Sequence, residues 1–156
     1  MYQTSKRRKI TKAMREAVYS KYHGHCAYCG CEINISQMQV DHLIPMEFYE
    51  QYKADGIDID SMENYMPACR SCNNYKSSLT LEKFRRAVER WHEVLLRDSV
   101  TYKNAVRFGQ VKPNPHPVVF YFEKIEEDQR VHRLRVRFAE KSEEILKRVR
   151  ARNEHA

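Results

Sequence analysis

Residues 69–76 read CRSCNNYK, and the C-x-x-C at their start repeats the C-x-x-C of CAYC at residues 26–29. Each motif presents two thiolates to one ion from a tight turn, and two motifs complete the tetrahedral shell of a structural zinc. A single motif would also suit redox chemistry. Two in a short chain favour a metal, with disulfides, a rubredoxin-like iron centre or inert thiols as alternatives. The predicted ligands are Cys26, Cys29, Cys69 and Cys72.

The predicted zinc is structural rather than catalytic. Four protein ligands leave no open position for chemistry. Zinc binding to small peptides is worth about 10–16 kcal/mol, which is comparable with the whole stability of a domain, about 5–15 kcal/mol. The fifth cysteine, Cys31, is interpreted as a bystander thiol, with substitution as a ligand as the alternative.

The chain is basic, with a net charge of +7 in 156 residues and a pI near 9.2. Its length fits one domain. Cations gather in residues 5–12, 76–107 and 141–152, and acids gather in residues 47–63. Nucleic acid is the expected partner of such a surface, and a solvated basic surface without a partner is the alternative. No apolar signal segment or membrane span is apparent, so we expect a cytoplasmic protein with reduced thiols.

Helices are expected on both sides of the cysteine motifs. Met14, Val18 and Tyr22 recur every four residues and Gly24 follows them, which predicts a helix from Lys12. Apolar residues recur on one face of residues 81–98, with Thr80 as a candidate N-cap, and a shorter helix is expected over residues 100–108.

The C-terminal region is harder to assign. The three prolines of KPNPHP, residues 112–117, predict an extended connector. The β-branched and aromatic residues of VVFYFE, residues 118–123, predict a strand. From residue 126 onward the pattern fits a strand or a helix, and the Glu, Lys and Arg content favours a helix.

A second polar feature lies between the cysteine motifs. In QMQVDHLIP, residues 37–45, Asp41 and His42 interrupt an apolar run. Adjacent side chains on a strand point to opposite faces, so the strand is expected to end or distort at this pair, with Pro45 marking its exit. A zinc that joins the two motifs would bring this segment close to ENYMP, residues 63–67, and to CNNYK, residues 72–76.

The ordered pattern C-x-x-C, D-H-x-x-P, N-x-x-P, C-x-x-C-N-x-x-K resembles the HNH endonucleases of the ββα-metal group. The resemblance implies a two-stranded hairpin followed by a helix that together hold one divalent metal at the scissile phosphate. It implies that His42 is the general base and that Asp41 binds this metal. It also implies that Asn64 pins the loop that orients the histidine, and that Asn73 is the second ligand of the metal.

Asn73 departs from the commonest form of the motif, since many relatives have histidine at this position. A carboxylate and an amide oxygen are hard ligands, which suit Mg²⁺ or Mn²⁺. A helix N-cap is the alternative role for Asn73, and Asn74 is the alternative ligand.

The basic segments are expected to hold DNA through its phosphates. The candidate contacts are Lys76, Lys83, Arg86 and Arg90, together with the N-terminal arm and the C-terminal tail. A solvated surface is the alternative role for Lys76. Phosphate contacts position DNA without reading its sequence, so modest sequence specificity is expected. Asp58 and Asp60 are interpreted as a polar loop. Five further histidines are interpreted as surface residues or neighbours of the metal ligands: His23, His25, His92, His116 and His132.

Together these observations predict an α+β protein with a small zinc-stabilised ββα-metal core and flanking helices. The expected organisation is a basic arm and helix over residues 1–25, the core over 26–80, amphipathic basic helices over 81–110, and a strand and helix over 111–156. The predicted function is a metal-dependent DNA endonuclease, acting as a monomer or a homodimer. A non-catalytic zinc-stabilised nucleic-acid-binding module and an RNA-cleaving nuclease of the same fold are the alternatives.

Overall fold

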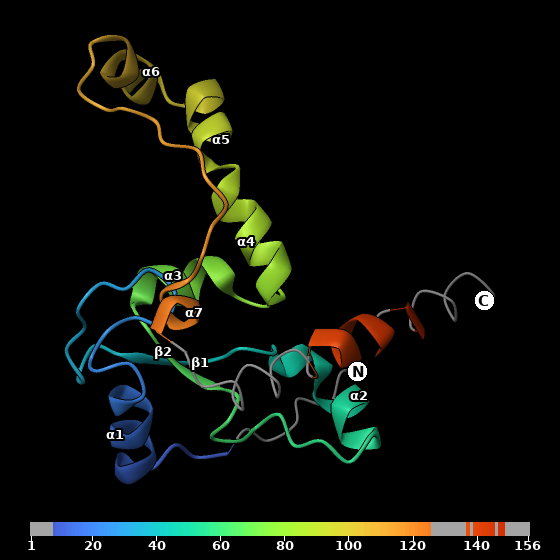
Figure 1. Cartoon of the computed structure of the whole chain (residues 1–156). Helices are drawn as coiled ribbons and strands as arrows, with labels where there is room; N and C mark the ends of the chain where they lie inside the picture. The colour runs from blue at the N-terminus through green and yellow to red at the C-terminus, as the bar shows by residue number, and fades with distance from the viewer. Residues whose placement is uncertain (1–7, 126–136, 138, 146, 149–156) are drawn as a thin grey trace.

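The computed structural model describes residues 8–125, 137, 139–145 and 147–148. At its centre the strands β1 (Gln39–His42) and β2 (Tyr65–Ala68) pair in antiparallel register, with His42 opposite Tyr65. The helix α3 (Arg70–Lys76) follows β2 and packs against β1. This strand–strand–helix unit and the helices around it confirm the predicted α+β fold (Figure 1).

The helix α1 (Lys12–Ser20) precedes the hairpin and packs against β2. The Thr11 side chain caps its first turn by accepting a hydrogen bond from the Met14 amide, and Gly24 follows with a φ of 76°. The helix itself ends at Ser20, and the left-handed conformation of Gly24, which suits glycine, lies in the turn that follows. Val18 is buried in a small core with Met38 and Tyr65, so α1 confirms the predicted first helix.

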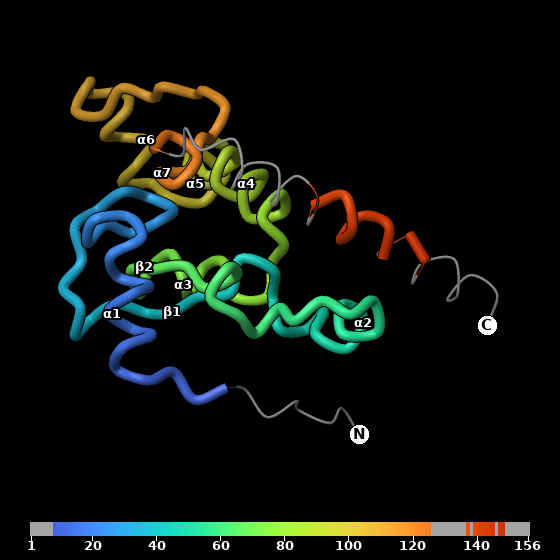
Figure 2. The backbone as a smooth tube through the Cα atoms, turned by 60° about the horizontal axis from the view of Figure 1, so that its bottom comes forward, coloured from blue at the N-terminus to red at the C-terminus, as the bar shows by residue number. Residues whose placement is uncertain are grey.

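The segment between the two strands folds as η1 (Met46–Phe48), α2 (Tyr49–Ala54) and a loop over residues 55–64. It lies beyond the end of the hairpin at which β1 ends (Figures 1 and 2). Tyr52 and Ile59 form a second core with Ile44 and Ile145. Residues 139–145 are helical, as predicted for the tail. The strand alternative rests on Leu134, Val136 and Phe138, which lie outside the described residues.

The predicted helix over residues 81–98 is instead two helices, α4 (Leu81–Glu89) and α5 (Trp91–Asp98). Thr80 caps α4 as expected. Only the first half of the apolar stripe reaches the core, where Phe84 is 1% exposed, whereas Leu95 is 42% exposed. None of the described side chains of α5 is buried, and the chain turns at Arg90, whose N–H bonds to the carbonyls of Arg86 and Val88.

The helix α6 (Val100–Arg107) follows α5 and confirms the prediction of a short helix that ends near Gly109. The helices α4, α5 and α6 lead away from the hairpin, and residues 112–120 run back beside them without regular structure (Figure 1). This return segment is attached to α4, because the Val118 amide donates to Glu89 and its carbonyl accepts from Arg85. The predicted extended connector is confirmed.

The predicted strand over residues 118–123 is wrong. Residues 118–120 belong to no strand, and Tyr121–Ile125 forms the short helix α7. The amides of Tyr121 and Phe122 donate to the carbonyls of Tyr28 and Ala27. Phe122 therefore fills the core beside Tyr28 from the helix α7, and Phe120 does so from the residue before that helix.

Among the described residues, no helix combines the length and the apolar character that crossing a membrane requires.

Candidate metal centre and active site

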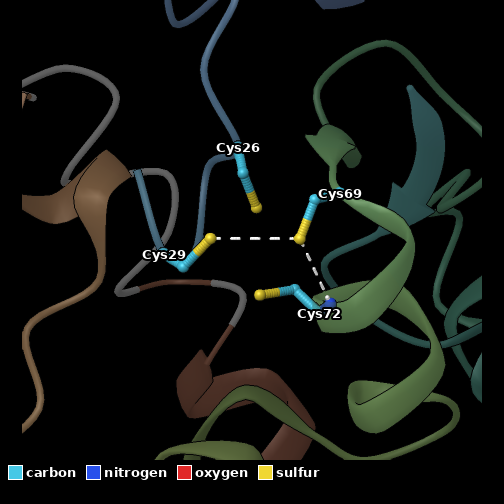
Figure 3. Close-up of side chains that lie close together, drawn as sticks. All are labelled: Cys26, Cys29, Cys69 and Cys72. Atoms are coloured by element: carbon cyan, nitrogen blue, oxygen red, sulfur yellow. Dashed lines mark hydrogen bonds between the residues drawn. The ribbon is translucent and has the colours of Figure 1, made fainter. Parts of the chain in front are cut away.

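The four cysteines of the two C-x-x-C motifs come together, and their sulfurs point toward one another (Figure 3). All four sulfur atoms lie within 4.8 Å of one another, and the sulfurs of Cys29 and Cys69 are 3.9 Å apart. Zn–S bonds of about 2.3 Å in a tetrahedron place the sulfurs about 3.8 Å apart. The donor set and its spacing therefore fit zinc.

The local chain supports this cluster from both sides. Cys26 and Cys29 lie in the turn after α1, where the Gly30 amide donates to the Cys26 carbonyl. Gly30 has a φ of 76°, and a Cβ there would lie 2.7 Å from the ring of Tyr121. Cys69 is the N-cap residue of α3, and its sulfur accepts a hydrogen bond from the Cys72 amide.

The cluster also shifts the acidity of its thiols. A hydrogen bond with Cys72 lowers the pKa of Cys26 to about 5, although burial opposes this shift. The same contact, together with burial, raises the pKa of Cys72. Four thiolates this close would repel one another, and a divalent cation offsets that repulsion. Cys31 is exposed and is not part of the cluster.

Asp41 lies on β1 and is 7% exposed. Its Oδ2 accepts a hydrogen bond from the Tyr28 hydroxyl and lies 2.9 Å from the Nζ of Lys76. Burial, and then the charge of Asp41, raise the pKa of Tyr28 well above its usual range, so this phenol stays a donor. Oδ1 has no hydrogen-bond or ion-pair partner among the described residues. One carboxylate oxygen is thus fixed and the other is available to a ligand.

Lys76 is fully buried, with 0% exposure. Besides its ion pair with Asp41, its Nζ donates to the His42 carbonyl at 2.7 Å. The predictions of a phosphate contact and of a solvated surface for Lys76 are both wrong, because the side chain faces the hairpin. A buried charge requires a partner, and here Lys76 holds the strand end that carries Asp41 and His42.

His42 is the last residue of β1, which confirms that the strand ends at the Asp41–His42 pair. Whereas Asp41 contacts α3, the His42 ring contacts the loop before β2. Its Nε2 lies 2.9 Å from Asp60 Oδ1, and its ring packs edge-on against Tyr65 with the centroids 5.1 Å apart. The Nδ1 atom makes no hydrogen bond with any described residue.

Asn64 ties the chain on both sides of this site. Its side-chain oxygen accepts from the Ile44 amide at 2.8 Å, and its nitrogen donates to the carbonyls of Ile44 and Ile59. The residue is 6% exposed. These three bonds hold the segment after His42 against the loop that carries Asp60.

Asn73 lies inside α3, one turn before Lys76 and therefore on the same face of the helix. Because Cys69 is the N-cap residue, the N-cap alternative for Asn73 is excluded. Its side chain is half-buried and has no hydrogen-bond partner among the described residues. Asn73 and Asp41 therefore offer an amide oxygen and a carboxylate oxygen from two elements that pack together, and this donor set fits Mg²⁺ or Mn²⁺.

The other predicted DNA contacts are exposed side chains of α4 and its end. Lys83, Arg86 and Arg90 are spaced by three and four residues and follow one stripe of the helix. Arg90 lies 3.8 Å from Glu93, whereas Lys83 and Arg86 have no acidic partner among the described residues. The N-terminal arm is described only from Arg8, which pairs with Asp58.

Tyr28, whose hydroxyl donates to Asp41, and Asp60 were not identified as site residues in the sequence. Asp60, interpreted above as part of a polar loop, is 6% exposed and contacts His42 directly. Nothing in its local pattern marks it, because its partner lies 18 residues away. The sequence shows only that a zinc joining the two cysteine motifs would bring the polar residues between them close together. It does not show which of these residues contacts His42.

Comparison with family models matches residues 26–79 to the HNH endonucleases. No curated protein matches the chain. The matched residues include the four clustered cysteines, the hairpin and α3. The chain therefore carries an HNH endonuclease domain over residues 26–79.

Proposed function

We propose that this chain is a metal-dependent DNA endonuclease that hydrolyses phosphodiester bonds with His42 as the general base. The observation that carries the proposal is the contact between the His42 ring and Asp60. The ring Nε2 is bonded to a carboxylate, which can only accept, so Nε2 carries a proton and, in the neutral ring, the lone pair is on Nδ1. Through Nδ1 the neutral imidazole can take a proton from water.

The remaining residues of the site have supporting roles in this proposal. Asp41 and Asn73 would hold a Mg²⁺ or Mn²⁺ ion, which when bound stabilises negative charge on the phosphate and the leaving oxygen. Lys76 and Tyr28 fix one oxygen of Asp41 and leave the other free for this ion. Asn64 fixes the backbone after His42. The four cysteines would hold a structural zinc away from the chemistry.

The proposed activity is tested on supercoiled plasmid DNA. Purified protein with Mg²⁺ or Mn²⁺ is expected to produce nicked or linear DNA, and omission of the divalent ion is expected to stop cleavage. Single-stranded and structured RNA serve as parallel substrates. Absence of DNA cleavage with either ion would contradict the proposal, and cleavage of RNA alone would reassign the substrate.

We also propose that Lys83, Arg86 and Arg90 bind DNA phosphates. Arg86→Gln is expected to weaken binding and to reduce the slope of log K against log salt by about 0.9, the value for one phosphate contact. Fluorescence anisotropy of a labelled duplex over a range of salt concentrations measures both quantities. Lys53→Gln is the matched control, because Lys53 is an exposed cation of α2 in the acidic segment. Equal slopes for the wild type and Arg86→Gln would contradict the contact.

A further inference from the structure

We propose that Asp60 is the positioning residue for His42, which it holds in the tautomer that leaves Nδ1 free to accept a proton. This inference rests on the proposed function, in which His42 is the general base. It assigns a role to a carboxylate that the sequence pattern places in an ordinary polar loop.

The contact between the two side chains is short and shielded from water. His42 Nε2 and Asp60 Oδ1 are 2.9 Å apart, and the side chains are 14% and 8% exposed. The imidazole ring is also held from one side by the edge-on contact with Tyr65. Two independent contacts therefore fix the direction of the ring as well as its tautomer.

Asp60 is itself held in place. Its Oδ1 also accepts from the Tyr65 hydroxyl at 2.7 Å, and its Oδ2 accepts from the Arg8 amide at 2.6 Å. The Asp60 amide donates to Asp58 at 2.9 Å, and the neighbouring Ile59 is anchored in a core. A carboxylate fixed by three donors and by its own backbone can orient the ring without moving during the reaction.

The same donors keep Asp60 charged. Burial acts to raise its pKa, but hydrogen bonds from His42, the Arg8 amide and Tyr65 together outweigh burial and lower the pKa below its usual value. Asp60 is therefore ionised at neutral pH and can only accept hydrogen bonds. An acceptor at Nε2 requires the proton to be on Nε2, and this leaves the lone pair on Nδ1.

Asp60 affects one step of the proposed reaction, the transfer of a proton from water to His42. When Nδ1 takes a proton from the attacking water, the resulting imidazolium faces the carboxylate of Asp60, which stabilises its charge. Asp60 does not itself take up the proton. The hydroxide attacks phosphorus, the bond from phosphorus to the leaving oxygen breaks, and the alkoxide that leaves takes a proton from solvent water. Asp60 is thus a positioning residue and not a catalytic residue.

Asp60→Asn is the direct test. An asparagine can turn its NH₂ group toward Nε2 and so favour the opposite tautomer, with the proton on Nδ1. We expect kcat for plasmid cleavage to fall at least 10-fold, within the 10²–10⁴-fold that a general base contributes. The KM for DNA is expected to change less than about 3-fold, because a shielded Asp60 does not contact the substrate. Glu50→Gln, at an exposed carboxylate of α2 in the same acidic segment, is the matched control.

The second measurement does not depend on activity. The ring ¹⁵N signals of His42, assigned by their loss in His42→Ala, report which nitrogen carries the proton. We expect a protonated Nε2 in the wild-type protein and a shift toward a protonated Nδ1 in Asp60→Asn. If the wild-type protein does not cleave DNA, this readout still decides the positioning role. Unchanged His42 signals in a folded Asp60→Asn protein would overturn the inference.

Tyr65→Phe provides a variant that alters the site less. It removes one donor to Asp60 but keeps the ring against which His42 packs. We expect His42 to keep a protonated Nε2 in this variant, because Asp60 remains an acceptor there, and we expect a loss of kcat smaller than that of Asp60→Asn. If Asp60→Asn does not fold, the ¹⁵N signals of the wild-type protein decide the proposal, and a neutral His42 with its proton on Nδ1 would overturn it.

Discussion

Cys72→Ser is expected to unfold the domain of residues 26–79, as is removal of zinc by a chelator. The reason is that the free energy of zinc binding is as large as the net stability of a domain. A structural zinc contributes about 10–16 kcal/mol of apparent binding free energy, and a domain of this size has a net stability of about 5–15 kcal/mol. The four cysteines join the turn after α1 to the start of α3, so without the ion these two segments separate.

Far-UV circular dichroism during heating, together with the zinc content of the purified protein, measures this effect. The wild-type protein is expected to bind one zinc ion and to melt cooperatively, whereas Cys72→Ser is expected to lose both properties. Cys31→Ser is the matched control, because Cys31 is exposed and lies outside the cluster. A Cys72→Ser protein with the melting temperature of the wild type would contradict a structural zinc.

The elements predicted correctly are those with strong local signals. The helix α1 has a capping threonine before it and Gly24 after it, and α6 ends beside Gly109. The strand end at His42 follows from the alternation of side chains and from Pro45. The cysteine cluster follows from ligand spacing. In each case the sequence signal that predicts the element lies within a few residues of it, or in a motif whose geometry is fixed by one ion.

The wrong predictions have a common physical cause, because each depends on contacts between distant segments. Lysine is rarely buried, and only the fold shows that Lys76 has Asp41 and the His42 carbonyl as partners. The β propensity of residues 118–123 is overridden by their contacts with the cysteine turn. The role of Asp60 depends on a partner 18 residues away.

His42→Ala is expected to reduce plasmid cleavage by 10²–10⁴-fold, the usual contribution of a general base. Zinc content and DNA affinity are expected to stay near the wild-type values, because His42 belongs neither to the cysteine cluster nor to the basic stripe of α4. The fold should tolerate the change, since Asp60 keeps the Tyr65 hydroxyl and the Arg8 amide as donors. The measurement is the initial rate of plasmid nicking with Mg²⁺.

A missing base can be distinguished from a disturbed site by chemical rescue. His42→Ala removes an imidazole that is 14% exposed, and free imidazole added to this variant is expected to restore part of the cleavage rate. His92→Ala is the matched control, because His92 is also half-buried and bonded to a neighbour, Tyr102, but lies in α5 outside the HNH domain. Wild-type activity in His42→Ala would exclude His42 as the base, and the lone pair on its Nδ1 would then have no part in cleavage.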